Sequence, residues 1–104
     1  MENLREFRKQ AEFLKALAHP TRLCIVSGLL REEGCNVNQI KECLNLPQST
    51  VSQQLAILRA AGIVEGERRG TEVCYRVVDD RAQKLVKVLI KDTDHQETLS
   101  QTKT

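Results

Sequence analysis

The segment Val37–Val64, VNQIKECLNLPQSTVSQQLAILRAAGIV, decides the fold, because its pattern is that of two short helices with one break between them. Just before it, Asn36 and Gln39 have the spacing of a capping box, in which each side chain satisfies the other's backbone amide. The first helix ends at 45–47, where Pro47 disfavours helical backbone in the residue before it. Its apolar face consists of Val37, Ile40 and Leu44. Two short helices joined by a tight turn are typical of a helix-turn-helix motif.

The second helix of the pair, predicted for residues 48–61, begins with uncharged hydrogen-bonding side chains. Its buried face has the helical spacing of Val51, Leu55 and Leu58, and Gly62 ends it. A solvated helix face normally carries Lys and Glu instead. The polar residues at its start are Gln48, Ser49, Thr50, Ser52, Gln53 and Gln54. Capping alone would account for one Ser or Thr, so the set predicts a surface that exchanges hydrogen bonds with a partner.

Two further helices precede the pair. The first is predicted for about residues 2–17, from apolar residues at three- and four-residue steps. The second starts at Pro20, whose missing N–H suits a first helical position, and ends at 33–34, where Gly34 can adopt a left-handed cap. His19 is expected to cap or pack this helix rather than to act in catalysis. The apolar stripe of the first helix is Leu4, Phe7, Ala11, Leu14 and Leu17.

A β-hairpin is predicted after the fourth helix. Its first strand starts at Ile63, and Arg68-Arg69-Gly70 is expected to form the turn, because glycine accepts positive φ there. In the second strand apolar and polar residues alternate, which is typical of a half-buried strand. The apolar residues are Val73, Tyr75 and Val77. The hairpin is therefore predicted to carry a basic tip.

Asp79 or Asp80 is expected to cap a last helix, and residues 93–104 form a polar tail that is expected to be disordered. The apolar stripe of this helix is Ala82, Leu85, Val86 and Leu89. The sequence thus predicts one domain over 1–92, mainly α with a β-hairpin wing, in the winged helix-turn-helix order α-α-α-α-β-β-α. The stripes of the first and last helices exceed what this small domain can cover, so a homodimer through both helices is expected.

The composition is that of a small soluble domain. The 104 residues carry a net charge of +2 and only 3% aromatic residues, which disfavours binding of single-stranded nucleic acid by base stacking. The N-terminal sequence shows no signal-peptide pattern, and no apolar run approaches the roughly 20 residues of a membrane span. A cytoplasmic location is expected, with the four cysteines as reduced thiols. The two histidines lie in a helix cap and in the tail, and no glycine-rich phosphate loop occurs, so no enzyme is predicted.

In a helix-turn-helix, the N-terminal residues of the second helix contact base edges in the major groove of duplex DNA. Glutamine can bond bidentately to adenine, and serine or threonine can address several bases or a phosphate. We expect Thr50, near the helix start, to bind phosphate, and Gln54 to contribute to the same surface. The residues expected to contact bases are Gln48, Ser49, Ser52 and Gln53.

Arg68 and Arg69 in the wing are expected to hold phosphates or to enter the minor groove. The alternative is a solvated turn, because three nearby acids almost balance the two arginines. These acids are Glu65, Glu67 and Glu72. We favour DNA contact, since two adjacent arginines at a wing tip are well placed to reach the backbone.

The sequence resembles the ArsR/SmtB family of bacterial winged-helix repressors. The matching stretches, over roughly residues 14–77, are LKALAHPTRLCIVSGLL, VNQIKECLNLPQSTVSQQLAILRAAGIV and RRGTEVCYRV. The resemblance implies a homodimer that binds an imperfect palindromic operator and releases it when an effector binds. Effectors in the family include metal ions, arsenite-type thiophiles and reactive sulfur or oxidants, and some members have no known ligand.

The metal-binding motifs of the family match this sequence poorly. The Cys-x-Cys pair at the start of the third helix corresponds to Asn36 and Asn38, with Cys35 one residue outside. The ligands of a second site, on the last helix, correspond to Asp79, Arg81, Asp92 and His95. Arg81 would repel a cation, so transition-metal sensing is disfavoured. Pro47 and Gln54 also depart from residues frequent in the family, which affects operator preference.

The cysteines are the remaining candidates for an effector site. Cys24 is expected to be accessible, and Cys74 lies on the polar face of a strand. Cys35 precedes a helix N-terminus, which can lower the pKa of a thiol. Cys43 is expected to be a buried packing residue. A thiol sensor for arsenite, a persulfide or an oxidant, centred on Cys35 with Cys24 or Cys74, is thus favoured over a divalent-metal sensor. No cofactor is assigned, and a metal or metalloid is considered only as an effector.

The predicted function is that of a duplex-DNA-binding transcriptional repressor that an effector releases from its operator. Two alternatives remain: a regulator of this family that needs no effector, and a winged helix that binds proteins and has no operator. A double-stranded RNA binder is disfavoured, because the major groove of A-form RNA does not admit a helix.

Overall fold

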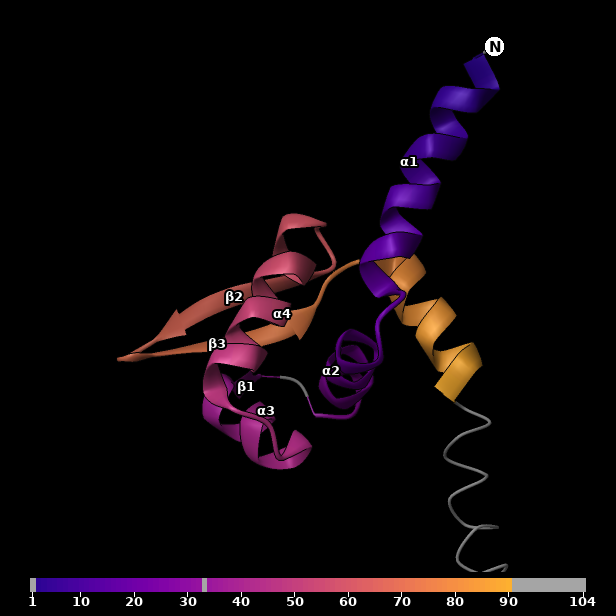
Figure 1. Ribbon diagram of the computed structural model, residues 1–104. Helices are drawn as coiled ribbons and strands as arrows, with labels where there is room; N and C mark the ends of the chain where they lie inside the picture. Colours follow the sequence, from indigo (N-terminus) through magenta and orange to yellow (C-terminus); the bar gives the residue numbers. More distant parts are fainter. Residues whose placement is uncertain (1, 33, 91–104) are drawn as a thin grey trace, which may run out of the picture.

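The computed structural model describes residues 2–32 and 34–90, so the predicted 93–104 tail lies outside the described residues. Its elements, in chain order, are α1 (Glu2–Leu17), α2 (Pro20–Arg31), β1 (Cys35–Asn36), α3 (Val37–Leu44), α4 (Gln48–Ala60), β2 (Val64–Arg69) and β3 (Glu72–Val77). A C-terminal helical segment covers residues 80–90. Figure 1 shows α3 and α4 packed beside the β2–β3 hairpin, which projects from the body as the wing. The predicted winged helix-turn-helix order is confirmed.

Local sequence signals account for the helix boundaries. The side chain of His19 caps α2 by accepting a hydrogen bond of 3.1 Å from the amide of Thr21, as expected. Both halves of the predicted capping box at the start of α3 are present, between Asn36 and Gln39. The left-handed conformation of Asn45, with φ of 57°, ends α3 and turns the chain toward α4. These caps set the angle between the two helices of the motif.

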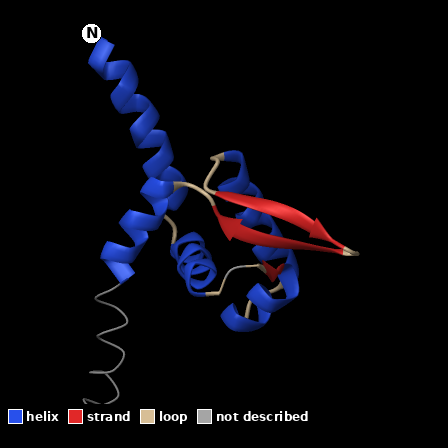
Figure 2. Cartoon of the chain, turned by 180° about the vertical axis from the view of Figure 1, so that it is seen from behind, coloured by secondary structure: helices blue, strands red, loops and turns tan. Residues whose placement is uncertain are grey.

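The sheet contains one strand more than the sequence predicted. It has three antiparallel strands in the order β1-β3-β2, and Cys35 of β1 pairs with Tyr75 of β3 (Figure 2). A two-residue strand has no periodicity of its own, so only its pairing with β3 identifies it. This pairing places the start of α3 against the base of the wing.

The predicted turn at Arg68-Arg69-Gly70 is wrong by two residues. Arg68 and Arg69 are the last residues of β2, and Arg69 pairs with Glu72. The turn itself is Gly70-Thr71, with Gly70 at φ of 67°. A two-residue turn preserves the twist of the strands, and one glycine at positive φ is enough to start it. The arginines therefore project from paired strand positions.

Gly66 of β2 lies opposite Tyr75, whose ring packs across it. A Cβ atom at position 66 would meet Val73 Cγ1 at 2.8 Å, closer than Cβ atoms approach other atoms in proteins, and Tyr75 Cε1 at a tight 3.0 Å. Glycine is therefore required for Tyr75 to reach the core from the base of the wing.

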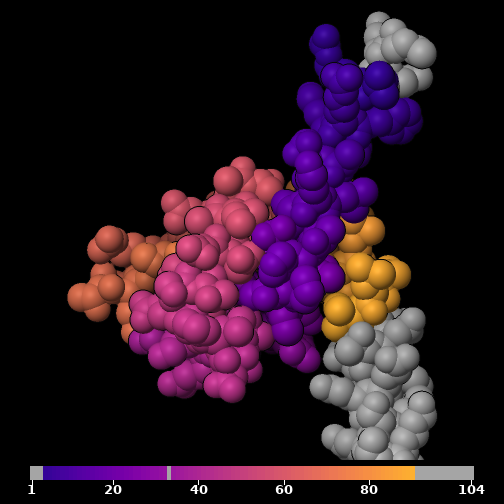
Figure 3. Space-filling model, in the orientation of Figure 1, coloured from indigo at the N-terminus to yellow at the C-terminus, as the bar shows by residue number. Residues whose placement is uncertain are grey.

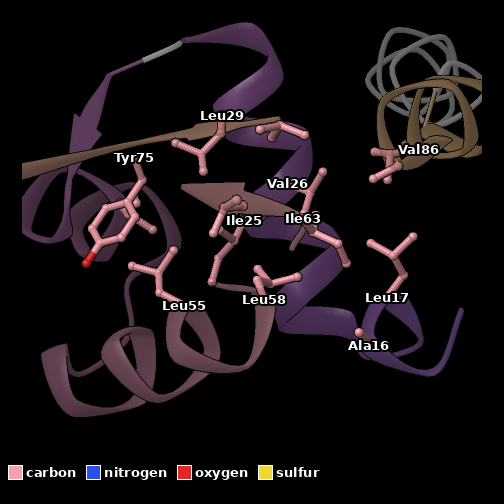
Figure 4. Packing of buried hydrophobic residues seen from close by; sticks show 14 of the residues in the cluster. Ala16, Leu17, Ile25, Val26, Leu29, Leu55, Leu58, Ile63, Tyr75 and Val86 are labelled. Atoms are coloured by element: carbon pink, nitrogen blue, oxygen red, sulfur yellow. The ribbon is translucent and has the colours of Figure 1, made fainter. Parts of the chain in front are cut away.

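One apolar core joins all the described helices and the base of the wing. Figure 4 shows side chains from α2 and α4 meeting Ile63 and Tyr75, with Val86 of the C-terminal segment at one side. The most completely buried large side chains are Ile25, Val26, Leu29, Val51, Leu55, Leu58, Ile63 and Val86. The three predicted inward residues of α4 are among them. Since this core reaches α4 from three directions, the orientation of that helix is fixed about its own axis.

Helix α1 and the C-terminal segment expose apolar side chains. Figures 1 and 3 show the N-terminal half of α1 extending away from the body. On α1, Phe7 is 65% exposed, and on the C-terminal segment Val88 is 68% exposed. The other large ones are Leu4, Leu14, Leu85 and Leu89. Among the α1 side chains that the structure describes, only Phe13, Ala16 and Leu17 reach the core, so most of the predicted stripe is uncovered. In the part of the chain that is described, no helix is long and apolar enough to cross a membrane.

Candidate nucleic-acid interface

The N-terminal half of helix α4 has one buried apolar face and one exposed polar face. Val51, Leu55 and Leu58 are buried in the core, as expected from their spacing. The outward residues Gln48, Ser49, Ser52 and Gln53 are all exposed, and none of them bonds to another side chain in the described part of the chain. Their donors and acceptors therefore face solvent and are available to a partner.

The first turn of α4 also presents backbone amides. Pro47 occupies the N-cap position, and no side chain caps the helix. The first hydrogen bond into the helix is made by the amide of Val51, which donates to the Pro47 carbonyl at 3.2 Å. The amides of Gln48, Ser49 and Thr50 precede it and have no carbonyl one turn earlier to bond. Together with the half-buried hydroxyl of Thr50, these amides form a start that favours an anion.

Gln54 differs from the four exposed residues. It is half-buried, and its side-chain oxygen accepts a hydrogen bond of 2.7 Å from Arg22 Nη1. Sequence patterns missed Arg22, because its partner on α4 is 32 positions away.

The two wing arginines differ in whether they form an ion pair with a described residue. Arg69 forms an exposed ion pair with Glu67, with Nη2 and Oε1 3.1 Å apart. Arg68 makes no ion pair with any described residue and lines a hollow together with Arg59 and Val73. A surface ion pair contributes about 0–1 kcal/mol, so Arg69 can exchange Glu67 for a phosphate at little cost.

Three cysteines share one small pocket between α2 and α3. Cys24, Cys35 and Cys43 line it together with apolar residues of both helices, in a volume of about 50 Å³. Cys24 is exposed, as expected, but Cys43 is exposed as well, so its predicted burial is wrong. The adjacent Leu44 takes the inward position at the end of α3 instead. Cys74 lines a different hollow, at the base of the wing.

The predicted lowering of the Cys35 pKa is also wrong. Partial burial raises the pKa of Cys35, and the Glu32 carboxylate and the neighbouring thiols Cys43 and Cys74 raise it further. The thiol donates a hydrogen bond of 3.1 Å to the Glu32 carbonyl. Burial in the first place, and the Glu32 carboxylate in the second, set the direction of the Cys35 pKa shift. Cys35 is therefore a protonated thiol at neutral pH.

The contacts that the Asp79 side chain makes are those of a helix cap and an ion pair, rather than those of a metal ligand. Its Oδ1 accepts from the Ala82 amide at 2.9 Å, and its Oδ2 lies 3.2 Å from Arg81 Nη2. Burial acts to raise the pKa of Asp79, but these hydrogen bonds and the Arg81 charge outweigh it and hold the pKa below its ordinary value. Within residues 4–32 and 34–90, no three His, Cys, Asp or Glu side chains are placed to hold a metal ion. The other two candidates, Asp92 and His95, lie outside the described residues.

Arg81 connects the C-terminal segment to α1. Its Nη1 donates to Gln10 Oε1 at 2.7 Å, and its guanidinium lies 4.1 Å from the centre of the Phe13 ring. The position that matches a metal ligand in the resemblance is thus occupied here by a contact between the two helices with exposed apolar faces.

A helix-turn-helix domain model matches residues 17–67. Over 75 residues the chain is 47% identical to the HTH-type transcriptional repressor SmtB of Mycobacterium tuberculosis, an alignment that covers 72% of this chain and 55% of SmtB. The chain thus spans little more than half the length of that relative. It is also 42% identical over 79 residues to the transcriptional repressor PagR of Bacillus anthracis, covering 76% of this chain and 79% of PagR.

Solved structures agree with the sequence relatives. The crystal structure of PagR has a TM-score of 0.76 to this chain at 38% identity, and covers 83% of this chain and 98% of that one. The antimony-specific transcriptional repressor AntR has a TM-score of 0.79 at 26% identity, and covers 90% of this chain and 85% of that one. The fold, the two-faced α4 and these similarities agree, and the chain belongs to the ArsR/SmtB family of winged helix-turn-helix repressors.

Proposed function

We propose that this protein is a cytoplasmic transcriptional repressor that binds duplex DNA as a homodimer. The observation that carries the proposal is the outward face of α4, where four uncharged hydrogen-bonding side chains are exposed beside free helix-start amides. Gln48, Ser49, Ser52 and Gln53 contact base edges in the major groove, and Thr50 contacts a phosphate. The names of the relatives, SmtB and PagR among them, support the same function.

Arg68 and Arg69 of the wing bind the DNA backbone next to the site of α4. Both are exposed strand residues, so their side chains reach outward from a rigid hairpin. Neutralising phosphates with arginine releases counterions, which supplies affinity without sequence preference. The wing then provides affinity, and α4 provides specificity.

The homodimer forms through α1 and the C-terminal segment. Six large apolar residues are exposed there, and the Arg81 contacts to Gln10 and Phe13 hold the two helices together. An exposed apolar surface of this kind is costly in water unless a partner covers it. In a two-fold dimer, two copies of α4 would contact half-sites about one helical turn, roughly 10 bp, apart.

Binding of duplex DNA from upstream of the protein's own gene tests this function. Fluorescence anisotropy with that duplex should show tight binding, and a duplex of equal length and scrambled sequence should bind at least about 1,000-fold more weakly. Equal affinity for both duplexes at every salt concentration would leave no operator and would favour the alternative of a protein-interaction module.

The effector is a thiol-reactive species rather than a divalent metal, and a trivalent metalloid such as arsenite is the first candidate. Cys24 and Cys35 lie on one pocket at the junction of α2 and α3, and Cys43 joins them there. Because Cys35 is protonated at rest, it is a poor nucleophile toward a persulfide or an oxidant. A metalloid hydroxide instead condenses with thiols and releases water, and one structural neighbour is antimony-specific. Cys74, in the adjacent hollow, is a secondary candidate.

Titration of the protein–DNA complex with arsenite, zinc and a persulfide donor tests the effector. Arsenite should release the DNA from the wild type, and Cys35→Ser should remain bound. Cys74→Ser tests the secondary candidate: a retained response would place Cys74 outside the effector site. If none of the three compounds releases DNA, the alternative of a regulator of this family that needs no effector is favoured.

A further inference from the structure

Arg22, near the start of α2, binds two other helices at once. Its Nε donates to the Ala16 carbonyl at 2.6 Å, and its Nη2 lies 3.5 Å from the Lys15 carbonyl, both in the last turn of α1. Its Nη1 donates to Gln54 Oε1 on α4 at 2.7 Å. One rigid guanidinium thus spans the end of a helix with an exposed apolar face and the helix with the exposed polar face.

At the α1 end of this contact, Arg22 satisfies carbonyl groups in the last turn of that helix. The last carbonyls of a helix have no intrahelical donor. In α1, the amide of Ala18 bonds to Leu14 and Lys15, and the amide of His19 bonds to Leu17. Among the described residues, Arg22 supplies the donor for the remaining carbonyl, that of Ala16. The guanidinium is therefore held in place independently of α4.

The α4 end of the contact determines how Gln54 is presented. Arginine has donors and no acceptor, so Gln54 must turn its oxygen toward Arg22. The amide nitrogen is then directed away from Arg22, and it donates to no other described residue. Gln54 follows Gln53 on the same helix, next to the surface proposed to contact DNA. In this orientation Gln54 presents two donors, which suit a phosphate oxygen or a base acceptor.

We propose that Arg22 is a positioning residue that fixes Gln54 as a hydrogen-bond donor toward DNA and thereby links the end of α1 to the recognition helix. Arg22 itself does not contact DNA. This inference rests on the operator binding proposed above. Its consequence is that the contribution of Gln54 to operator binding exists only when Arg22 is present.

A double-mutant cycle on operator affinity tests the link, with Arg22→Met, Gln54→Met and the double variant. Methionine keeps most of the side-chain volume and removes the hydrogen bond. Each single variant should bind the operator about tenfold more weakly, and the double variant should bind no more weakly than either, because one shared interaction has been lost. Arg22→Lys keeps the charge without the fork of donors, and it should bind as weakly as Arg22→Met.

Lys15→Met is the matched control. It removes one positive charge from the same end of α1, where the Lys15 side chain is 77% exposed and pairs only with Glu12 among the described residues. This variant should keep wild-type affinity. Thermal unfolding of each variant, followed by circular dichroism, checks that the fold is retained before affinities are compared.

Salt dependence separates positioning from direct contact. A residue that neutralises a phosphate changes the slope of log K against log salt by about 0.9 per contact, whereas a positioning residue leaves the slope unchanged. Additive losses in the cycle, full affinity in Arg22→Lys or a reduced slope in Arg22→Met would each overturn the inference. If the wild type itself binds no operator, the proposed function fails instead, whatever the variants do.

Discussion

Helix α4 and the pair formed by α1 and the C-terminal segment expose opposite kinds of surface. On α4, Val51, Leu55 and Leu58 are buried, and the exposed face of the N-terminal half consists of amides and hydroxyls, with Ile57 42% exposed further along the helix. On α1 and the C-terminal segment the exposed face is apolar, with Phe7 and Val88 about two-thirds exposed. An ordinary surface helix exposes mainly charged side chains, so the uncharged polar face of α4 and the apolar face of α1 and the C-terminal segment indicate partners of different chemistry.

The difference lies in what each partner must supply. Uncharged donors and acceptors can hydrogen-bond to water, so their exposure costs little free energy. Base edges or phosphates replace this water when DNA binds. Apolar side chains gain free energy only when water is removed, and a second copy of the same surface achieves this by symmetry. Affinity for DNA and affinity between protomers should therefore respond to different substitutions.

The largest expected effect is on the free energy of unfolding, when a Leu→Ala substitution at a buried position of α4 is compared with the same substitution at an exposed position of α1. Leu58→Ala removes a fully buried side chain of α4 and should lower the free energy of unfolding by about 2–5 kcal/mol. Leu14→Ala, at a residue 50% exposed on α1, should cost under about 1 kcal/mol at low protein concentration. Chemical denaturation at several concentrations measures both. The cost of Leu14→Ala should grow with concentration, because dimerisation stabilises by mass action. A concentration-independent cost would contradict burial of Leu14 in a dimer.

A charge on the apolar face should separate the protomers. Phe7→Asp places a carboxylate where the proposed dimer excludes water, and it should raise the dimer dissociation constant at least about 100-fold. Sedimentation equilibrium measures the change. Lys9→Asp, on an exposed position of the same helix, should have a much smaller effect. Similar dissociation constants for both variants would move the interface away from Phe7.

Replacing the wing arginines should change operator affinity only through the salt dependence of binding. If Arg68 and Arg69 each neutralise a phosphate, replacing both with Ala should flatten the slope of log K against log salt by about two units per protomer. Removing Lys84 and Lys87 from the C-terminal segment subtracts the same charge and should leave the slope nearly unchanged. An unaltered slope in the double arginine variant would remove the wing from the interface.

A single base-contacting residue should change specificity more than affinity. Gln53→Ala should relax the preference at one base position in each half-site, at a cost of about 1–3 kcal/mol for the preferred base. Binding to a set of operators with single base changes measures the preference. A uniform loss across the whole set would identify Gln53 as a phosphate contact.

The smallest effect concerns the start of the C-terminal segment. The pKa of Asp79 is lowered in the folded protein, so its stabilising contribution is present above the ordinary pKa of aspartate and is lost as the pH falls through the folded value. The wild type should therefore lose more stability than Asp79→Asn between neutral and strongly acidic pH, because asparagine keeps the cap without the charge. Parallel pH profiles in urea unfolding would show that Asp79 carries no such linkage.

Much of the fold and part of the candidate site could be predicted from the sequence. Caps, helical spacing and strand alternation depend on residues within a few positions of each other, and so His19, the Asn36–Gln39 box and the two faces of α4 were predictable. The two-residue strand β1 and the place of the turn after Arg69 were not, because pairing between distant segments decides them.

By itself, the sequence determined the order of the elements, which face of α4 is buried, and the presence of apolar surface on the first and last helices. Only the tertiary structure decided that Cys43 shares an exposed pocket with Cys24 and Cys35, that Cys35 is a protonated thiol, and that Arg22 binds Gln54. The physical reason is that these properties depend on electrostatic fields and hydrogen bonds between side chains distant in the chain. Such contacts exist only after the helices have packed.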